Sequence, residues 1–168
     1  MRALLDSLWR LALRLAYRLL LAWWFVRRPT IHGSYVAVWH GDRLLVIRNS
    51  YRKRLSLPAG GRARGETLRD AAARELREEV GVCVEADQLA YYGELVHHTG
   101  YAEDHAHVFE LRCGAAPELR VDRREVIWAD FLTPEDALAL GVVGVVRLYL
   151  ERVASLAQRG EAERRPSG

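Results

Sequence analysis

Apolar residues dominate the first 28 positions and are interrupted by arginine at a helical interval. Arg10, Arg14 and Arg18 recur at every fourth position. Placing the residues at 100° intervals gathers most of the charged and polar side chains within an arc of about 160°, opposite a side of leucine and alanine. The pattern predicts an amphipathic helix over residues 1–28 that stops at Pro29, since proline does not continue a helix.

After this segment the pattern becomes that of a mixed α+β domain. Strand-like apolar runs occur at Ser34–His40, Arg43–Arg48, Leu89–His98, Ala106–Arg112 and Glu125–Phe131. Helical patterns occur at Thr67–Val80, in a short helix that opens at Thr133-Pro134-Glu135, and at Val142–Gln158. The first two strands are joined by Gly41-Asp42, which predicts a hairpin. We therefore expect an α+β domain over residues 29–158 and a polar, disordered tail at 159–168.

Composition excludes several classes of protein. Half of the chain is hydrophobic and 28% is charged, which is typical of a globular domain. The two cysteines, Cys83 and Cys113, are too few for a disulfide framework, so a reducing, cytoplasmic compartment is expected.

The positive charge is confined to the N-terminus. Residues 1–28 carry six arginines and one aspartate, a net charge of +5, so the rest of the chain carries −2 of the overall +3. A nucleic-acid-binding domain carries its positive charge on the folded body. No nucleic acid is therefore expected as a partner.

The N-terminal segment is expected to bind a membrane surface or a hydrophobic partner. Its longest uncharged run, Leu19–Val26, is far shorter than the ~20 residues of a spanning helix. Arginines beside a wide apolar arc suit the lipid interface. These features predict a peripheral position on the inner face of the membrane. The alternatives are that the helix folds back onto the domain or forms a homodimer.

Three glutamates on one helical turn are the strongest indication of chemistry. Glu75, Glu78 and Glu79 lie at positions i, i+3 and i+4 and share one helix face. Their mutual repulsion is removed by a divalent cation, and oxygen-only ligands favour Mg²⁺ or Mn²⁺. The alternative is an ordinary solvated helix in which Arg74 and Arg77 pair with these carboxylates.

The residues around these glutamates form a longer pattern. Gly60 is followed by five residues, Glu66, seven residues and then the run Arg-Glu-Leu-Arg-Glu-Glu-Val-Gly-Val that ends at Val82. This stretch resembles a Nudix box at each of its fixed positions. The resemblance implies the Nudix fold, a mixed β-sheet sandwiched between helices, here with an extra N-terminal amphipathic helix. It also implies hydrolysis of a diphosphate linkage in a nucleoside diphosphate joined to another moiety, with Mg²⁺ or Mn²⁺.

The resemblance assigns roles to residues of the box. Glu75, Glu78 and Glu79 are implied as metal ligands together with the backbone of Gly60. Glu78 or Glu79 is implied to assist the deprotonation of water, and Arg74 to orient Glu75.

Residues outside the box complete the candidate site. Glu125 and Glu103, with the neighbouring Asp104, are candidates for a further base or ligand; the alternative is that they are surface carboxylates. The candidates for substrate binding are four arginines near the box that can hold phosphates and one tyrosine that can stack on a base: Arg48, Arg52, Arg62, Arg64 and Tyr101. For each of these arginines the alternative is a solvated basic loop.

Three functions remain open from the sequence. The first is a Mg²⁺-dependent pyrophosphohydrolase, which the complete set of box glutamates favours. The second is a non-hydrolytic Nudix-fold module that senses a nucleotide at a membrane or partner surface. The third is a membrane-targeting or partner-docking protein in which Glu75–Glu79 is only a charged helix. The specific diphosphate substrate is not determined by these motifs.

Overall fold

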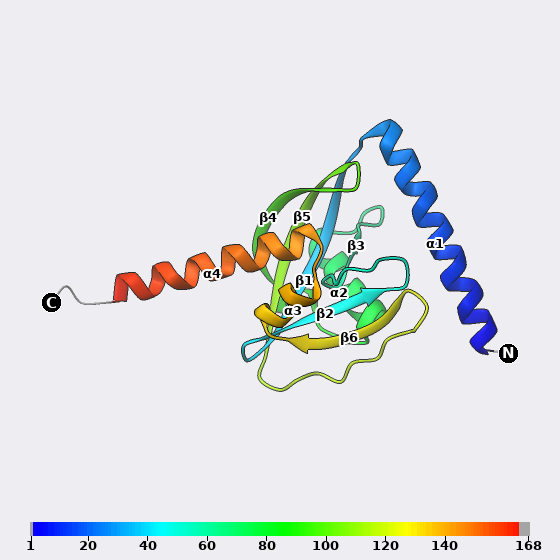
Figure 1. The fold of residues 1–168 in the computed structure, drawn as a ribbon. Coiled ribbons are helices and arrows are strands. Elements are labelled where there is room, and N and C mark those ends of the chain that lie inside the picture. Colours follow the sequence, from blue (N-terminus) through cyan, green and yellow to red (C-terminus); the bar gives the residue numbers. More distant parts are fainter. Residues whose placement is uncertain (1, 165–168) are drawn as a thin grey trace.

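A mixed six-stranded sheet with helices on both faces organises the chain (Figure 1). The computed structural model describes residues 2–164. In chain order the elements are α1 (Arg2–Arg27), β1 (Thr30–His40), β2 (Arg43–Asn49), β3 (Ala59–Gly61), α2 (Leu68–Val80), the 3₁₀ turn η1 (Ala86–Gln88), β4 (Ala90–Thr99), β5 (Ala102–Cys113), β6 (Val126–Leu132), α3 (Pro134–Leu140) and α4 (Gly144–Arg164).

The strand order is β4-β5-β1-β2-β6, with β3 paired to β1. The central pair, β1 and β5, is parallel from Thr30 opposite Glu103 to His40 opposite Cys113. The other strand pairs are antiparallel, including the β1–β2 hairpin that the sequence predicts. The expectation of a mixed α+β sheet is confirmed.

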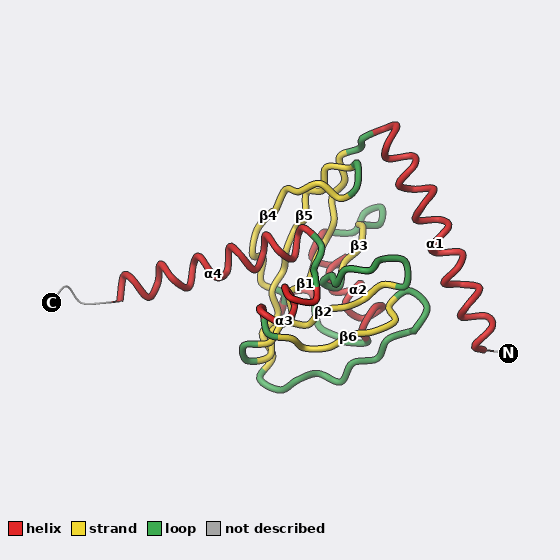
Figure 2. The backbone as a smooth tube through the Cα atoms, in the orientation of Figure 1, coloured by secondary structure: helices red, strands yellow, loops and turns green. Residues whose placement is uncertain are grey.

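Each face of the sheet has its own core. On one face Leu76 and Val80 of α2 pack among buried β1 residues such as Val36. On the other face α4 inserts Tyr149, whose hydroxyl accepts a hydrogen bond of 2.7 Å from the Trp39 Nε1–H. Figure 2 shows the helices on the two sides of the strands. The two apolar layers bury both faces of the central strands, as a sheet between helices requires.

Local chemistry defines the ends of α2. The Thr67 side chain accepts a hydrogen bond from the Asp70 backbone N–H, at 3.1 Å, which satisfies one of the free donors of the first turn. Gly81 ends the helix with φ of 74°, and its N–H donates to the Arg77 carbonyl. The helix predicted at Thr67–Val80 is confirmed within one residue.

Two features differ from the sequence pattern. The segment Ala59–Gly61 lies outside all of the strand-like runs in the sequence, yet it forms the short strand β3, because it pairs with Gly33–Tyr35 of β1. Helix α4 continues to Arg164, into the range expected as a tail, and projects away from the sheet (Figure 1). Residues 165–168 of that expected tail lie outside the described residues.

Helix α1 lies along the flank of the sheet opposite the end of α4 (Figure 1). Its observed range, Arg2–Arg27, agrees with the helix expected before Pro29. Among the described helices, none combines the length and apolarity that crossing a bilayer requires.

The burial of α2 generates a prediction for stability. Replacing Leu76 with alanine should lower the free energy of unfolding by about 2–5 kcal/mol, because it leaves a cavity in the core between α2 and the sheet. Denaturant unfolding measures this change. Leu140→Ala on α3 is the control, since 59% of Leu140 is already exposed. Equal losses in the two variants would contradict the packing described for α2.

Candidate active site

A cleft of about 480 Å³ lies where β1 and β3 meet α2. Its lining contains the carboxylates Glu75, Glu78, Glu79, Asp104 and Glu125. The three box glutamates come from one face of α2, as their spacing predicts; Asp104 comes from β5, and Glu125 from the loop that ends just before β6.

Glu79 is held at the buried side of this cleft. Its Oε2 accepts a hydrogen bond of 2.8 Å from the Ala59 backbone N–H, and Asn49 Nδ2 approaches its Oε1 at 3.5 Å. Burial raises the pKa of Glu79 to about 8, and the charges of Glu75 and Glu125 act in the same direction. The carboxylate is thus desolvated beside like charges, an arrangement that a cation relieves.

Gly60 permits the approach of Glu75 to β3. A Cβ atom at position 60 would lie 2.0 Å from Glu75 Oε1, so any other residue type there would displace this carboxylate from its place in the cleft. Burial raises the pKa of Glu75, against the opposing effect of Arg74. The backbone of Gly60 and the Glu75 carboxylate therefore occupy neighbouring positions in the cleft, where the sequence places two metal-binding groups.

Arg74 joins the box helix to the preceding loop. Its Nε donates to Glu66 at 2.9 Å, and its Nη2 donates to the Gly61 carbonyl at 2.9 Å. Its Nη1 lies 2.6 Å from Glu75 and 3.2 Å from Glu78. These contacts position Arg74 to orient Glu75. One of these contacts, between Arg74 and Glu78, is the ion pair that an ordinary solvated helix would also form. The Glu78 side chain is accordingly 52% exposed.

Of the carboxylates expected outside the box, Glu125 reaches the cleft and Glu103 does not. Glu125 Oε1 accepts a hydrogen bond of 2.9 Å from the Tyr51 hydroxyl. Burial raises the pKa of the Tyr51 hydroxyl, and the charge of Glu125 raises it further. Glu103 is exposed near the start of β5 and pairs with His105 Nε2 at 3.1 Å. Side chains alternate along a strand, so the neighbouring Asp104 faces the cleft instead.

Asp104, a candidate from the sequence, is the centre of a buried polar group whose other members, Tyr35 and His97, the sequence pattern did not identify. It is 1% exposed, and its Oδ2 accepts a hydrogen bond of 2.6 Å from the Tyr35 hydroxyl. His97 Nε2 lies 3.6 Å from the same oxygen, and burial lowers the pKa of His97 against the opposing effect of Asp104. Tyr35 and His97 lie on strands that pair with β5, so the group depends on strand register.

Arg52 is the one arginine of the predicted substrate-binding set that lines the cleft. Its guanidinium lies over the rings of Tyr17 and Tyr51, at 5.0 and 5.6 Å from their centroids. Arg48 lies over Trp128 at 5.5 Å and lines a neighbouring groove.

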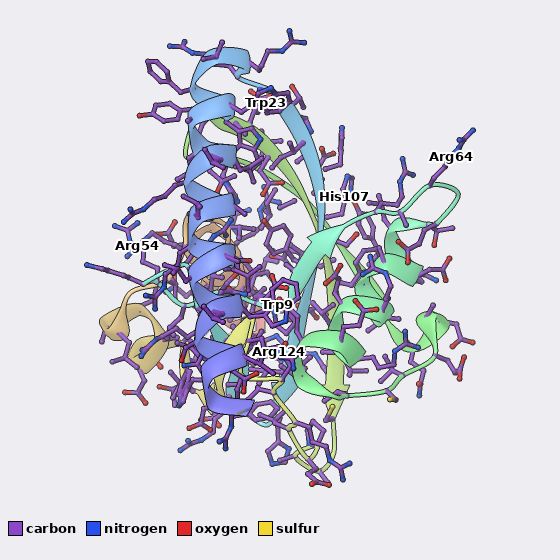
Figure 3. All side chains as sticks on the ribbon, turned by 90° about the vertical axis from the view of Figure 1, so that its right-hand side faces the viewer. Trp9, Trp23, Arg54, Arg64, His107 and Arg124 are labelled. Atoms are coloured by element: carbon purple, nitrogen blue, oxygen red, sulfur yellow. The ribbon has the colours of Figure 1, made fainter. Side chains whose placement is uncertain are left out.

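The remaining predicted substrate contacts lie away from the cleft. Arg62 and Arg64 are exposed in the loop between β3 and α2, and Figure 3 shows Arg64 on the outer edge of the molecule. Tyr101 packs edge-on against Phe25 of α1, with 4.9 Å between ring centroids. Its partner is thus a helix side chain, which the local sequence does not reveal.

The cleft has the donor chemistry of a site for a hard divalent cation. Within the described residues, the side chains do not converge as a ready group of three or more ligands, and Arg74 lies between Glu75 and Glu78. Two observations support this fit. The residues of α2 that line the cleft, Glu75, Glu78 and Glu79, are all carboxylates, and the buried Glu79 lies beside like charges. Glu75, Glu78 and Glu79 are the residues that would hold the cation.

Comparisons with known proteins agree with this architecture. A family model described as NUDIX domain matches residues 31–152. No match was found among the curated proteins. Several solved structures have a similar fold.

A MutT NUDIX hydrolase from Burkholderia pseudomallei is 22% identical, covers 74% of this chain and 98% of its own, and has a TM-score of 0.64. A bifunctional NMN adenylyltransferase/ADP ribose pyrophosphatase from Francisella tularensis, complexed with AMP and a Mn ion, is 17% identical, covers 85% of this chain and 46% of its own, and has a TM-score of 0.62. The NUDIX domain of Shewanella oneidensis NrtR, complexed with ADP ribose, is 11% identical, covers 76% of this chain and 88% of its own, and has a TM-score of 0.66.

The family match spans most of the chain and includes the whole of the box from Gly60 to Val82. The fold, the cleft and the match lead to the same assignment. The chain belongs to the Nudix hydrolase family.

Proposed function

We propose that the protein is a Mg²⁺- or Mn²⁺-dependent pyrophosphohydrolase that cleaves the diphosphate linkage of a nucleoside diphosphate joined to another moiety. The observation that carries this proposal is that the three box glutamates, Glu125 and Asp104 all line one cleft. The AMP and manganese of the Francisella tularensis structure and the ADP ribose of the Shewanella oneidensis structure support the choice of substrate class.

The residues of the cleft divide the chemical work. A bound divalent cation supplies neutralisation of phosphate charge and acidification of water. Glu75, Glu78 and Glu79 would hold the cation, and the Ala59 N–H and Asn49 orient Glu79.

Groups outside the box complete the reaction. Arg52 binds a phosphate oxygen at the edge of the cleft. Glu125 accepts a proton from the attacking water at the oxygen that Tyr51 does not bind. The oxygen of that water forms the new bond to phosphorus as the bond to the bridging oxygen breaks.

The proposed location is the inner face of a membrane, with residues 1–28 as the contact. The two cysteines are free, which suits a reducing compartment. The exposed apolar side chains of α1 support a membrane surface over a purely aqueous location.

Glu78→Gln and Glu79→Gln should each lower kcat/KM by at least about 100-fold, because each removes a charged ligand for the cation. Phosphate release from a panel of nucleoside diphosphate derivatives measures the effect. Glu151→Gln, an exposed change on α4, is the matched control. Wild-type rates in both box variants would place the active site elsewhere. Binding of nucleotides without turnover in the wild type would favour the sensor function.

Gly60→Ala should reduce activity and Mn²⁺ affinity at least about 10-fold, because the new methyl group collides with Glu75. Gly61→Ala is the matched control, since a Cβ there has no atom within 4 Å. Kinetics and isothermal titration with Mn²⁺ measure the two quantities. Equal behaviour of the two variants would mean that the Gly60–Glu75 contact does not matter for the site.

The raised pKa of Glu79 predicts how stability depends on pH in the presence of a chelator. Between the ordinary glutamate value and about 8, the folded state binds more protons than the unfolded state, so stability falls as the pH rises. We expect Tm to fall by roughly 5 °C from pH 6 to pH 9 and Mn²⁺ to raise Tm more at the higher pH.

Glu79→Gln is the comparison for this pH effect. It should flatten the fall in Tm, because glutamine does not titrate. The assignment would be contradicted if the wild-type Tm did not fall between pH 6 and pH 9. It would also be contradicted if the Tm of the variant fell by the same amount as that of the wild type.

A further inference from the structure

Helix α1 turns polar side chains toward its own domain. Three contacts attach it: Arg124 Nε donates to Asp6 at 3.0 Å, Arg10 Nε donates to the Arg123 carbonyl at 2.9 Å, and Arg14 Nε donates to the Ser50 carbonyl at 3.0 Å. Surface helices of globular proteins normally bury an apolar stripe. The N-terminal half of α1 instead turns its polar side toward the domain and its apolar side away from it.

The side of α1 that faces away from the domain is apolar. This outer face comprises Leu8, Trp9, Leu11, Leu15, Leu19 and Trp23, each between 52% and 64% exposed. Trp9 and Trp23 lie toward the two ends of the helix in Figure 3, which views α1 from outside. A helix of 26 residues is about 39 Å long, and the residues of the outer face extend over most of that length, which makes them a continuous exposed apolar patch of the kind that marks an interaction site.

The domain itself does not cover the outer face, because the arginines on the other side of the helix are engaged with Ser50 and Arg123. Rotating α1 inward would break these contacts and the Asp6–Arg124 ion pair. The occupant of the outer face therefore comes from outside the domain.

A basic groove borders the same helix. It lies between α1 and residues 48–53, has a volume of about 660 Å³, and is lined by the cations Arg14, Arg18, Arg48, Arg52 and Lys53. No carboxylate is among the described residues that line it. Within the described part of the chain, the Nε atoms of Arg48 and Arg52 are buried without a hydrogen-bond partner. Buried donors without partners are costly, and a phosphate group satisfies both their charge and their hydrogen bonds.

The basic groove adjoins the catalytic cleft. Asn49, Tyr51 and Arg52 line both. Arg52 thus lies between the domain-facing side of α1, where it contacts Tyr17, and the carboxylates of the box. A phosphate held in the groove is close to the site where the diphosphate linkage is cleaved.

We propose that the outer face of α1 lies in the surface of an anionic bilayer, that the basic groove binds the headgroup phosphate of an anionic lipid of that bilayer, and that the adjoining cleft takes up the diphosphate linkage of a neighbouring nucleotide-linked lipid. The substrate class is then a nucleoside diphosphate whose second moiety is a membrane lipid. This inference rests on the proposed function.

Charge selects the bilayer over a second copy of the chain. The segment 1–28 carries a net charge of +5, so two outer faces brought together would repel each other, whereas anionic lipid attracts them. Arginine stems beside an apolar face reach the headgroups, and Trp9 and Trp23 suit the interfacial layer.

Flotation of the full-length protein with vesicles tests the docking. Vesicles of phosphatidylcholine with phosphatidylglycerol should carry the wild type, more weakly at high salt, and phosphatidylcholine alone should carry less. Leu15→Glu/Leu19→Glu should abolish flotation. Leu140→Glu/Leu156→Glu is the matched control, with the same added charge at positions 59% and 55% exposed on other helices.

The docking is overturned if the wild type does not float or if the Leu15→Glu/Leu19→Glu variant floats equally well. A wild-type dimer in sedimentation that this variant converts to a monomer, without flotation of either, would assign the outer face to a second copy. Circular dichroism confirms that the variants remain folded.

Two probes with the same nucleotide test the substrate class: cytidine diphosphate diacylglycerol in vesicles and water-soluble cytidine diphosphate glycerol. The wild type should hydrolyse the lipid probe with at least about 10-fold higher kcat/KM. Arg18→Gln/Lys53→Gln should lower the rate on the lipid probe about 10-fold and leave the soluble probe unchanged. Arg147→Gln/Arg159→Gln, on α4, is the matched control for lost charge.

Equal rates on the two probes would overturn the lipid assignment. Equal effects of Arg18→Gln/Lys53→Gln and Arg147→Gln/Arg159→Gln on the lipid probe would overturn it as well. Failure of the proposed function gives a different result. In that case neither probe, nor ADP-ribose, is hydrolysed with Mg²⁺ although the protein still floats, and the lipid substrate falls with the proposed function while the docking stands.

Discussion

The close approach of α2 to β3 is the constraint on which the site depends. Gly60 leaves room for the Glu75 carboxylate, and the neighbouring Ala59 N–H binds Glu79. Neither contact exists unless β3 pairs with β1 and the apolar side of α2 packs on the sheet. The cores on both faces of the sheet therefore act on the chemistry indirectly, because they fix the distance between a strand backbone and the carboxylates of a helix.

That packing brings carboxylates of like charge close together in a partly buried cleft, and their surroundings differ. Burial and neighbouring charges raise the pKa of Glu79, so its charged form is unfavourable without a cation. Glu75 and Glu78 instead contact Arg74, whose other contacts with Glu66 and Gly61 hold the loop of the box. One arginine thus maintains the loop and balances two of the carboxylates that a divalent cation would bind.

Helix α1 is attached to the domain through its polar side chains. Its arginines are used for attachment and for the basic groove, which leaves the apolar residues outside. The groove and the cleft share Arg52 and its neighbours, so the contact surface and the reaction site are parts of one continuous region. This continuity supports the proposal that the enzyme takes its substrate from a membrane surface.

Local chemistry in the sequence determined α2, its threonine cap, its glycine end, the shared face of Glu75, Glu78 and Glu79, and the amphipathic character of α1. These features repeat over short distances, so periodicity and end signals are sufficient. The tertiary structure alone decided that Ala59–Gly61 forms a strand, that Asp104 rather than Glu103 enters the cleft, and that Tyr101 packs on Phe25. It also decided which side of α1 faces the domain. Each of these outcomes depends on the register or docking of segments far apart in the chain, and a one-residue shift in strand register exchanges the side chain in the cleft for the one in solvent.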